Sequence, residues 1–240
     1  MSGRREEILK ELGLWPLWKL RNIYQRGDKP GATTDDRRSR ILRMHWQELK
    51  TAVAACKDCP LHEKRTQAVF GVGDENADWL FIGEGPGAEE DAKGEPFVGQ
   101  AGKLLDSMLS SIGLKRGENV YIANVVKCRP PGNRKPEPQE AQQCEPYLER
   151  QIALIQPKLI IALGRIAVQS LLQTDATISS LRGRVHDYRG IPLIVAYHPA
   201  YLLRNLPDKA KAWADLCFAR KTMRELQFQA SPPHEDVNQP

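Results

Sequence analysis

The chain contains 240 residues, of which 41% are hydrophobic and 27% charged, and its mean hydropathy is −0.50. This length allows one well-cored domain with a modest extension and excludes two large domains, and no apolar run reaches the roughly 18 residues that a membrane-spanning helix needs. The net charge is +5, and the first fifty residues hold 12 Lys and Arg against 7 Asp and Glu, so the basic excess lies at the front of the chain.

Residues 1–40 are expected to form a basic, Trp-containing extension. Apolar residues follow a partly helical spacing over residues 8–21, and Pro16 interrupts that segment. Residues 25–38 contain almost no apolar side chain and are predicted to be a flexible linker. On charge alone, weak attraction to nucleic acid and a merely solvated arm are equally good interpretations.

Residues 41–229 alternate between segments typical of helices and of strands. A helix is expected from Leu42, whose apolar spacing continues through Val53 to Cys56. Strands separated by helices form parallel βαβ units, so we predict an α/β fold, a three-layer α/β/α sandwich with a short, mainly parallel central sheet. The tail, residues 230–240, is expected to be disordered. The predicted strands are 78–83, 119–126, 158–163 and 191–197, and the predicted helices after the first are 99–112, 138–155, 165–172 and 207–227.

Five cysteines need an explanation, because no secretory signal is apparent and disulfides are uncommon in the cytoplasm, where we expect the protein. Cys56 and Cys59 form a C-x2-C pair, while Cys128 and Cys144 lie in polar sequence far from it. Four such thiols can hold zinc or an iron–sulfur cluster, and zinc more often takes two close pairs. The alternative for the pair is two buried apolar thiols. Cys217 lies between apolar residues of the last helix and is assigned to the core.

In a parallel sheet, ligands bind beyond the carboxyl ends of the strands, here at loops 84–98, 124–136 and 198–204. The first of these begins GEGPGA (83–88), a loose match to a dinucleotide-binding pattern. Pro86 lacks the N–H that would bind a phosphate, and the neighbouring acids would repel one. A dinucleotide site is therefore disfavoured, and a simple tight turn remains an alternative.

Four segments together resemble the family 4 uracil-DNA glycosylases, the iron–sulfur branch of that superfamily. The resemblance covers about residues 52–222, and its motifs are GEGPGAEED (83–91), GEPFVGQAGKLLD (94–106), NVVKCRPPGNRKPEP (124–138) and HPAYLLR (198–204). It implies a monofunctional hydrolase that flips uracil out of DNA and cleaves its N-glycosidic bond, leaving an abasic site for base-excision repair. It also implies a [4Fe-4S] cluster held by Cys56, Cys59, Cys128 and Cys144, and association with the nucleoid.

The resemblance also assigns roles around the base. Phe97 is similar to the aromatic residue on which uracil stacks, and its alternative is a buried core side chain. Asn124 corresponds to the residue that reads the uracil edge, since a neutral amide donates to O4 and accepts from N3–H. Its alternative is a cap of a strand-end turn. Glu90 occupies the position that excludes the methyl group of thymine, or it is a solvated acid at a helix start.

Cleavage leaves negative charge on the departing uracil, and a preorganised donor stabilises it. His198, in its HPAYLL context, is similar to the family's donor to uracil O2. Where the better-known branch has an Asp that serves the water nucleophile, this chain has Gly85. We therefore assign the orientation or activation of water to the neighbouring Glu84.

Contacts with DNA are expected from a basic loop and one further arginine. The loop offers Lys127, Arg129, Arg134 and Lys135, and Arg204 follows the segment that would enter the duplex. These charges are alternatively a solvated surface. We expect a monomer that acts on single- or double-stranded DNA, with residues 1–40 available to contact a repair or replication protein.

Three other functions are alternatives to this one. The branch that traps uracil-DNA covalently uses a His in an inserted basic loop, and RPPGNRKPEP (129–138) has none. A DNA-binding or polymerase-associated module with a weak or dead active site is opposed by the joint presence of Glu84, Phe97, Asn124 and His198. A zinc-stabilised structural domain is the third alternative.

Overall fold

The computed structural model describes residues 34–230, and the chain divides into two units, Met1–Arg37 and Arg38–Pro240. The predictions for segments 8–21 and 25–33 and for most of the tail lie outside the described residues. Residues 34–38, expected in a linker, instead begin the helix α2 (Thr34–Ile41). Two aspartates near its start favour a helix N-terminus. No helix among residues 34–230 is long and apolar enough to cross a membrane.

Six strands form one sheet in the order β1-β3-β2-β4-β6-β5. The four inner strands run parallel, and β1 and β5 are antiparallel at the edges. The prediction of a mainly parallel sheet is thus confirmed, with antiparallel edges that it did not include. The strands are β1 (Val72–Gly73), β2 (Trp79–Gly83), β3 (Val120–Asn124), β4 (Leu159–Leu163), β5 (Val185–Tyr188) and β6 (Ile191–Ala196).

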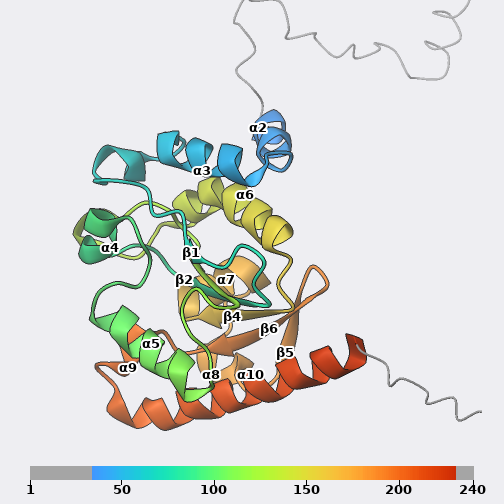
Figure 1. Ribbon diagram of the computed structural model, residues 1–240. Helices are drawn as coiled ribbons and strands as arrows, with labels where there is room; N and C mark the ends of the chain where they lie inside the picture. Colours follow the sequence, from blue (N-terminus) through green and yellow to red (C-terminus); the bar gives the residue numbers. More distant parts are fainter. Residues whose placement is uncertain (1–33, 231–240) are drawn as a thin grey trace, which may run out of the picture. The chain divides into compact units, whose positions relative to one another are not determined.

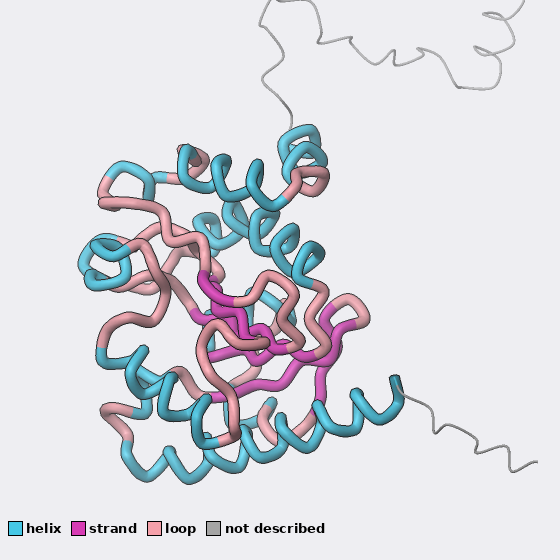
Figure 2. Tube along the Cα trace, in the orientation of Figure 1, coloured by secondary structure: helices cyan, strands magenta, loops and turns pink. Residues whose placement is uncertain are grey.

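Every residue of β2, β3 and β4 is buried, because helices cover both faces of the sheet (Figures 1 and 2). Leu80 and Ile82 of β2 point into a core with α3, α6 and α7. Trp79 and Phe81 point into a second core with α5, α9 and α10. The helices after α2 are α3 (Trp46–Ala55), α4 (Ala88–Lys93), α5 (Gln100–Ser111), α6 (Pro138–Ile155), α7 (Arg165–Leu172), α8 (Ile178–Leu181), α9 (Pro199–Leu202) and α10 (Lys209–Ala230), with 3-10 turns η1 (Pro60–Glu63), η2 (Pro131–Asn133) and η3 (Leu206–Asp208).

The first helix of the core begins later than its apolar spacing indicates. α3 starts at Trp46 because the backbone N–H of His45 donates to Oε2 of Glu48 at 2.9 Å, a local bond that closes the start of the helix. Leu42 lies in the preceding turn. The helix still ends where Cys56 begins the first cysteine pair.

The register of the sheet brings the chemistry-bearing loops together. Gly83, the last residue of β2, pairs with Asn124, the last residue of β3. On the other side, Leu163 of β4 pairs with Ala196 of β6, two residues before His198. The parallel strands therefore end at one edge, where the three loops predicted to carry the site emerge.

Candidate active site

Phe97 and Asn124 meet above Gly83. A Cβ atom on Gly83 would lie 2.5 Å from Cζ of Phe97 and 2.6 Å from Oδ1 of Asn124, closer than real Cβ contacts. Glycine is thus required because an aromatic ring and an amide both approach its backbone. The structure brings together two residues that the sequence analysis placed against the base.

The side chain of Asn124 is buried, with an exposed fraction of 2%. Its Oδ1 atom accepts no hydrogen bond from any described residue. An unpaired buried acceptor costs about 1–3 kcal/mol, so folded proteins rarely keep one without a use. This oxygen is therefore poised to accept a hydrogen bond from a ligand that enters beside Phe97.

Phe97 has a backbone conformation that aromatic residues seldom adopt, with φ of 55°. Arg116 donates from Nη1 to the carbonyl of Pro96 at 3.0 Å and from Nη2 to that of Phe97 at 2.8 Å. Gly102 of α5 lies so close that a Cβ there would be 1.8 Å from the Phe97 carbonyl oxygen. Strain of about 1–3 kcal/mol is thus offset by contacts that fix the ring. Arg116 was not predicted because it lies outside every quoted motif, and Gly102, although it lies within GEPFVGQAGKLLD (94–106), was given no role.

Glu90 joins two loops: the glycine loop (83–88) and the loop that carries Phe97 (94–99), called the Phe97 loop below. Its Oε2 accepts from the backbone N–H of Gly87 at 3.0 Å, and its Oε1 accepts from those of Val98 (3.0 Å) and Gly99 (3.1 Å). Both carboxylate oxygens are therefore engaged by the backbone. The alternative of a solvated acid does not describe this half-buried side chain.

His198 follows β6 and begins α9. Its Nδ1 accepts from the backbone N–H of Ala200 at 3.1 Å, which leaves the proton of the neutral ring on Nε2. Burial, and to a lesser extent the charge of Arg204, lower the pKa of His198 to about 4 against the opposing charge of Glu90. The ring lies 5.4 Å from that of Phe97, centroid to centroid, at 28°. His198 is thus a neutral Nε2–H donor beside the predicted stacking residue.

Glu84 and Gly85 form the glycine loop directly after β2. Burial raises the pKa of the Glu84 carboxyl, and Lys135 opposes that shift. A Cβ on Gly85 would lie 2.7 Å from Cγ2 of Val126, so the loop packs closely on the segment after β3. No hydrogen bond between described residues ties the Glu84 carboxylate to Asn124 or His198.

Two basic residues of the predicted DNA-binding loop have partners inside the protein. Lys127 is buried, with an exposed fraction of 1%, and its Nζ donates to the carbonyl of Asn124 at 2.9 Å. The structure corrects its assignment to DNA, because a side chain so enclosed cannot contact a phosphate. Arg134 makes two bonds, of 2.8 and 2.6 Å, to the carboxylate of Glu140, itself only 4% exposed.

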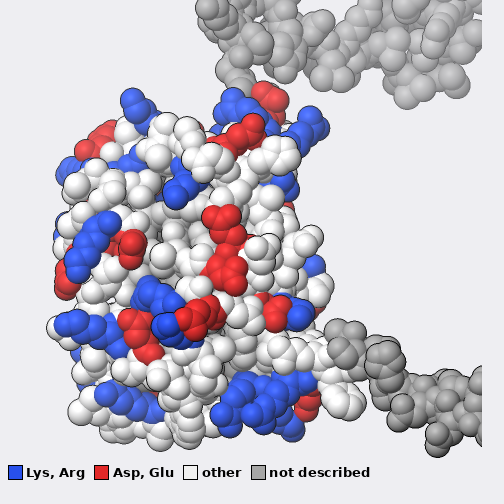
Figure 3. Space-filling view, in the orientation of Figure 1, with Lys and Arg blue, Asp and Glu red and all other residues white. Residues whose placement is uncertain are grey.

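Of the other three basic residues, Arg129 is half-buried, and its Nε donates to Oδ1 of Asn133 at 2.7 Å. Lys135 and Arg204 are exposed, as Arg134 itself is despite its bonds to Glu140. In the view of Figure 3, basic and acidic side chains are interspersed apart from a basic group over α10. Charge alone therefore does not mark the site. The basic residues of α10 are Lys209, Lys211, Arg220, Lys221 and Arg224.

The four predicted cluster ligands, Cys56, Cys59, Cys128 and Cys144, line one small cavity. Nη1 of Arg65 donates to Sγ of Cys128 at 2.8 Å, a bond typical of a sulfur that carries negative charge. Burial raises the pKa of each thiol, to about 11 for Cys56 and about 12 for Cys144. No three His, Cys, Asp or Glu side chains among the described residues lie close enough to share one metal ion.

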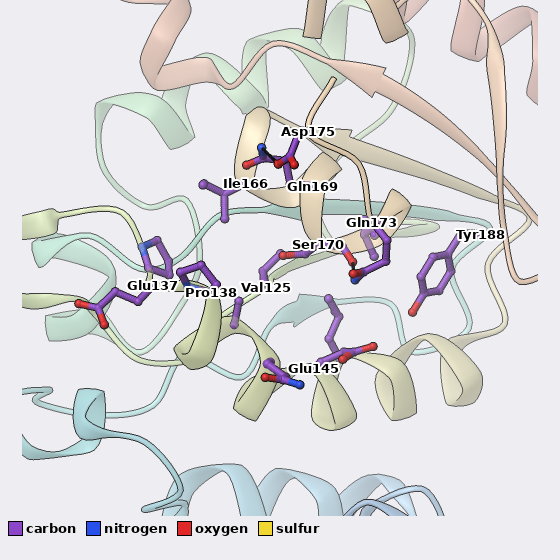
Figure 4. A pocket seen from close by; sticks show the side chains of 15 residues that line it. Val125, Glu137, Pro138, Glu145, Ile166, Gln169, Ser170, Gln173, Asp175 and Tyr188 are labelled. Atoms are coloured by element: carbon purple, nitrogen blue, oxygen red, sulfur yellow. Dashed lines mark hydrogen bonds between the residues drawn. The ribbon is translucent and has the colours of Figure 1, made fainter. Parts of the chain in front are cut away.

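A larger cavity, of about 410 Å³, lies between α6 and α7 (Figure 4). Val125 lines it from the residue after β3, and Tyr188 lines it from β5. None of the residues predicted for catalysis, base binding or metal binding is among those that line it. The cysteine cavity and the base-facing residues therefore both lie outside this larger cavity.

Residues 70–217 match the uracil DNA glycosylase superfamily. Three proteins named type-4 uracil-DNA glycosylase are similar to the chain. That of Archaeoglobus fulgidus is 48% identical over 159 residues, which cover 63% of this chain and 79% of that protein. That of Thermotoga maritima is 46% identical, covering 66% and 83%, and that of Pyrobaculum aerophilum is 43% identical, covering 72% and 92%.

Proposed function

The chain belongs to the type-4 group of the uracil-DNA glycosylase superfamily, and from this premise we infer that it is a uracil-DNA glycosylase. It flips uracil out of DNA and hydrolyses the N-glycosidic bond, the first step of base-excision repair. The observation that carries this function is the unpaired Oδ1 of Asn124, buried between the Phe97 ring and the end of the sheet.

Recognition of the base follows from these two side chains. Phe97 offers a fixed surface on which a flipped pyrimidine stacks. Oδ1 of Asn124 accepts from uracil N3–H, and the amide group donates to O4. Cytosine presents an acceptor at N3 and a donor at position 4, so it meets this amide with the wrong pattern.

Bond cleavage moves the electron pair of the C1′–N1 bond onto uracil, where negative charge spreads to O2. Nε2–H of His198 stabilises that oxygen by donation, without transferring its proton. Water attacks the electron-poor C1′ and loses a proton to Glu84, whose raised pKa suits a general base. Glu90 excludes thymine by holding the Phe97 loop in the place where a 5-methyl group would press.

The four cysteines are proposed to hold a [4Fe-4S] cluster. In such a cluster each thiolate binds a different iron atom, so the four sulfurs need not gather around one ion. Cys56 at the end of α3, Cys128 in the loop after β3 and Cys144 on α6 would hold the cluster together with Cys59, and a bound cluster would supply a covalent link between these segments. This link would shape the loop from which Arg129 and Lys135 are proposed to reach DNA, and Arg204, six residues after His198, is proposed to contact the duplex as well.

Release of uracil from a uracil-containing oligonucleotide tests this function, since each abasic site breaks in alkali. We expect Asn124→Ala to lower kcat/KM at least about a hundredfold, because a site built around a hydrogen bond loses it. Asn76→Ala, at an exposed turn, should match the wild type. Absence of alkali-labile sites with folded wild-type protein would contradict the function, and an unimpaired Asn124→Ala protein would contradict the base-reading role.

A further inference from the structure

Lys127 differs from every other lysine that the structure describes, since all the others are exposed. A lysine is almost never fully buried unless its charge has a partner. Moving an ammonium group out of water is costly, and one carbonyl hydrogen bond does not neutralise it. Its position therefore calls for a nearby negative charge.

No carboxylate supplies that charge. Lys127 takes part in none of the ion pairs between described residues, whereas Arg134 in the same loop pairs with Glu140. All four cysteines lie close by, because Lys127 lines the same cavity as they do. Its own backbone N–H donates to Sγ of Cys144 at 3.3 Å. Asp58 also lines this cavity, but its carboxylate accepts from Sγ of Cys56 at 3.1 Å and from the hydroxyl of Tyr147 at 3.2 Å. The other anions that this environment can offer are thiolates.

The ammonium group at the end of the Lys127 side chain reaches the active site. Nζ of Lys127 donates to the carbonyl oxygen of Asn124 at 2.9 Å, inside the protein. That carbonyl belongs to the last residue of β3, whose side chain carries the unpaired Oδ1. A single buried ammonium thus lies between the cysteine cavity and the residue proposed to read uracil.

We propose that Lys127 is a positioning residue that takes the cluster's thiolates as its counter-ion and holds the backbone of Asn124 in its base-reading position. This inference rests on the proposed function and deepens it. Occupancy of the cysteine site and the geometry of the uracil site are then coupled through one side chain. The cluster takes no part in the reaction.

Lys127→Met tests the proposal, because methionine fills a similar volume without charge. Removal of a positive charge beside the cluster should shift its reduction potential to more negative values. Loss of the bond to Asn124 should lower kcat/KM on uracil-DNA about tenfold or more. Lys57→Met is the matched control, since Lys57 lies between two of the cysteines but is exposed, and both quantities should stay at wild-type values.

A double substitution separates positioning from general loosening of the structure. In an Asn124→Ala background, Lys127→Met should lower activity little further, because the side-chain amide that Lys127 is proposed to position is already absent. Full additivity of the two losses would overturn the proposal. An unchanged potential in Lys127→Met would also overturn it, as would a changed potential with wild-type kcat/KM.

If Lys127→Met does not fold, Lys127→Arg decides. Arginine keeps the charge, but its larger planar head does not fit in the place of the buried ammonium group without displacing the Asn124 carbonyl, so we expect a wild-type potential with lowered kcat/KM. Wild-type values of both would overturn the proposal. If the wild-type protein contains no iron, both the cluster and this proposal are contradicted. If the wild-type protein contains iron and Lys127→Met has the wild-type potential and kcat/KM, only this proposal is contradicted.

Discussion

Several residues of the site have backbone angles, hydrogen bonding or protonation states that are unusual for their residue types. Phe97 has a positive φ, and Oδ1 of Asn124 is buried without a partner among the described residues. His198 stays neutral at a pH where an exposed imidazole would be charged. Deviations of this kind cluster at functional sites because the surrounding structure must sustain them. The same unfavourable states that lower the stability of the fold keep these side chains in the arrangement that is proposed to bind uracil.

The pH dependence of activity should separate the roles of Glu84 and His198. His198 remains neutral down to about pH 4 and so contributes no ionisation between about pH 5 and 8. Glu84 must lose its proton to act as a base, and burial raises its pKa, so kcat/KM should fall on the acid side as Glu84 becomes protonated. We expect the small residual activity of Glu84→Gln to lack this acid limb. Persistence of the limb in that variant would assign it to another group.

Arg134 and Lys135 are neighbours, yet substitution of the first should affect stability and substitution of the second should affect DNA binding. Arg134→Ala leaves the buried carboxylate of Glu140 unpaired and should lower Tm. The pair lowers the pKa of Glu140, so its stabilisation is present above the ordinary carboxyl pKa and is lost as pH falls through the lowered value. The difference in Tm between Arg134→Ala and wild type should shrink in the same way.

Lys135→Ala should leave Tm unchanged, because the side chain is exposed and forms no ion pair between described residues. Its expected effect is on DNA binding, where loss of one phosphate contact reduces the slope of log K against log salt by about one. Titration of a fluorescent oligonucleotide at several salt concentrations measures this slope. An unchanged slope would show that Lys135 is merely solvated.

Motifs located Phe97, Asn124 and His198 because each belongs to a recognisable string of residues. Lys127 was misplaced for a physical reason: a lysine among arginines and prolines has the composition of a surface loop, and only the tertiary structure shows the thiols around it. Arg116 carries no local signal, since its partners are backbone carbonyls about twenty positions away. Sequence patterns thus reveal side chains that act on substrate better than those that support them.

Among the elements, the Phe97 loop is the most constrained by its neighbours. Arg116 binds two of its carbonyls, and Nε of Arg116 also donates to Asp106 of α5 at 2.9 Å. We expect Arg116→Ala to lower kcat/KM about tenfold to a hundredfold, because a small displacement of the ring misaligns the base. Lys115→Ala is the control, since Lys115 pairs only with Glu118 among the described residues. Equal rates for the two variants would contradict this role.

The inner strands and long helices were predictable, and the short elements were not. The runs DWLFIG (78–83) and KLIIAL (158–163) are continuous and apolar because both faces of a parallel sheet are covered. β1 has only two residues, and β5 has the partly polar sequence VHDY, typical of an exposed edge. Helices α8 and α9 span four residues each, too few to show a helical period.

At the scale of the whole molecule, substitution of single cysteines tests whether the four hold a cluster or are thiols of the core. Cys56→Ser should abolish the absorbance near roughly 400 nm and lower Tm by at least about 5 °C, because a link between distant segments is lost. Cys217, on α10 and away from the cysteine cavity, provides the matched control. Cys217→Ser should retain both colour and Tm. A colourless wild-type protein with stoichiometric zinc, prepared without oxygen, would contradict the cluster.

The cysteine cavity has a consequence for the order of events during synthesis. Cys59 leaves the ribosome 85 residues before Cys144 does. At about 5–20 residues per second, the first pair of thiols waits roughly 4–17 s for its last partner. If the four cysteines hold the proposed cluster, iron that arrives in that interval meets an incomplete set of ligands, and productive delivery begins only after α6 has emerged. The timing of iron supply relative to translation, and not only the strength of the finished site, would then set the yield of active enzyme.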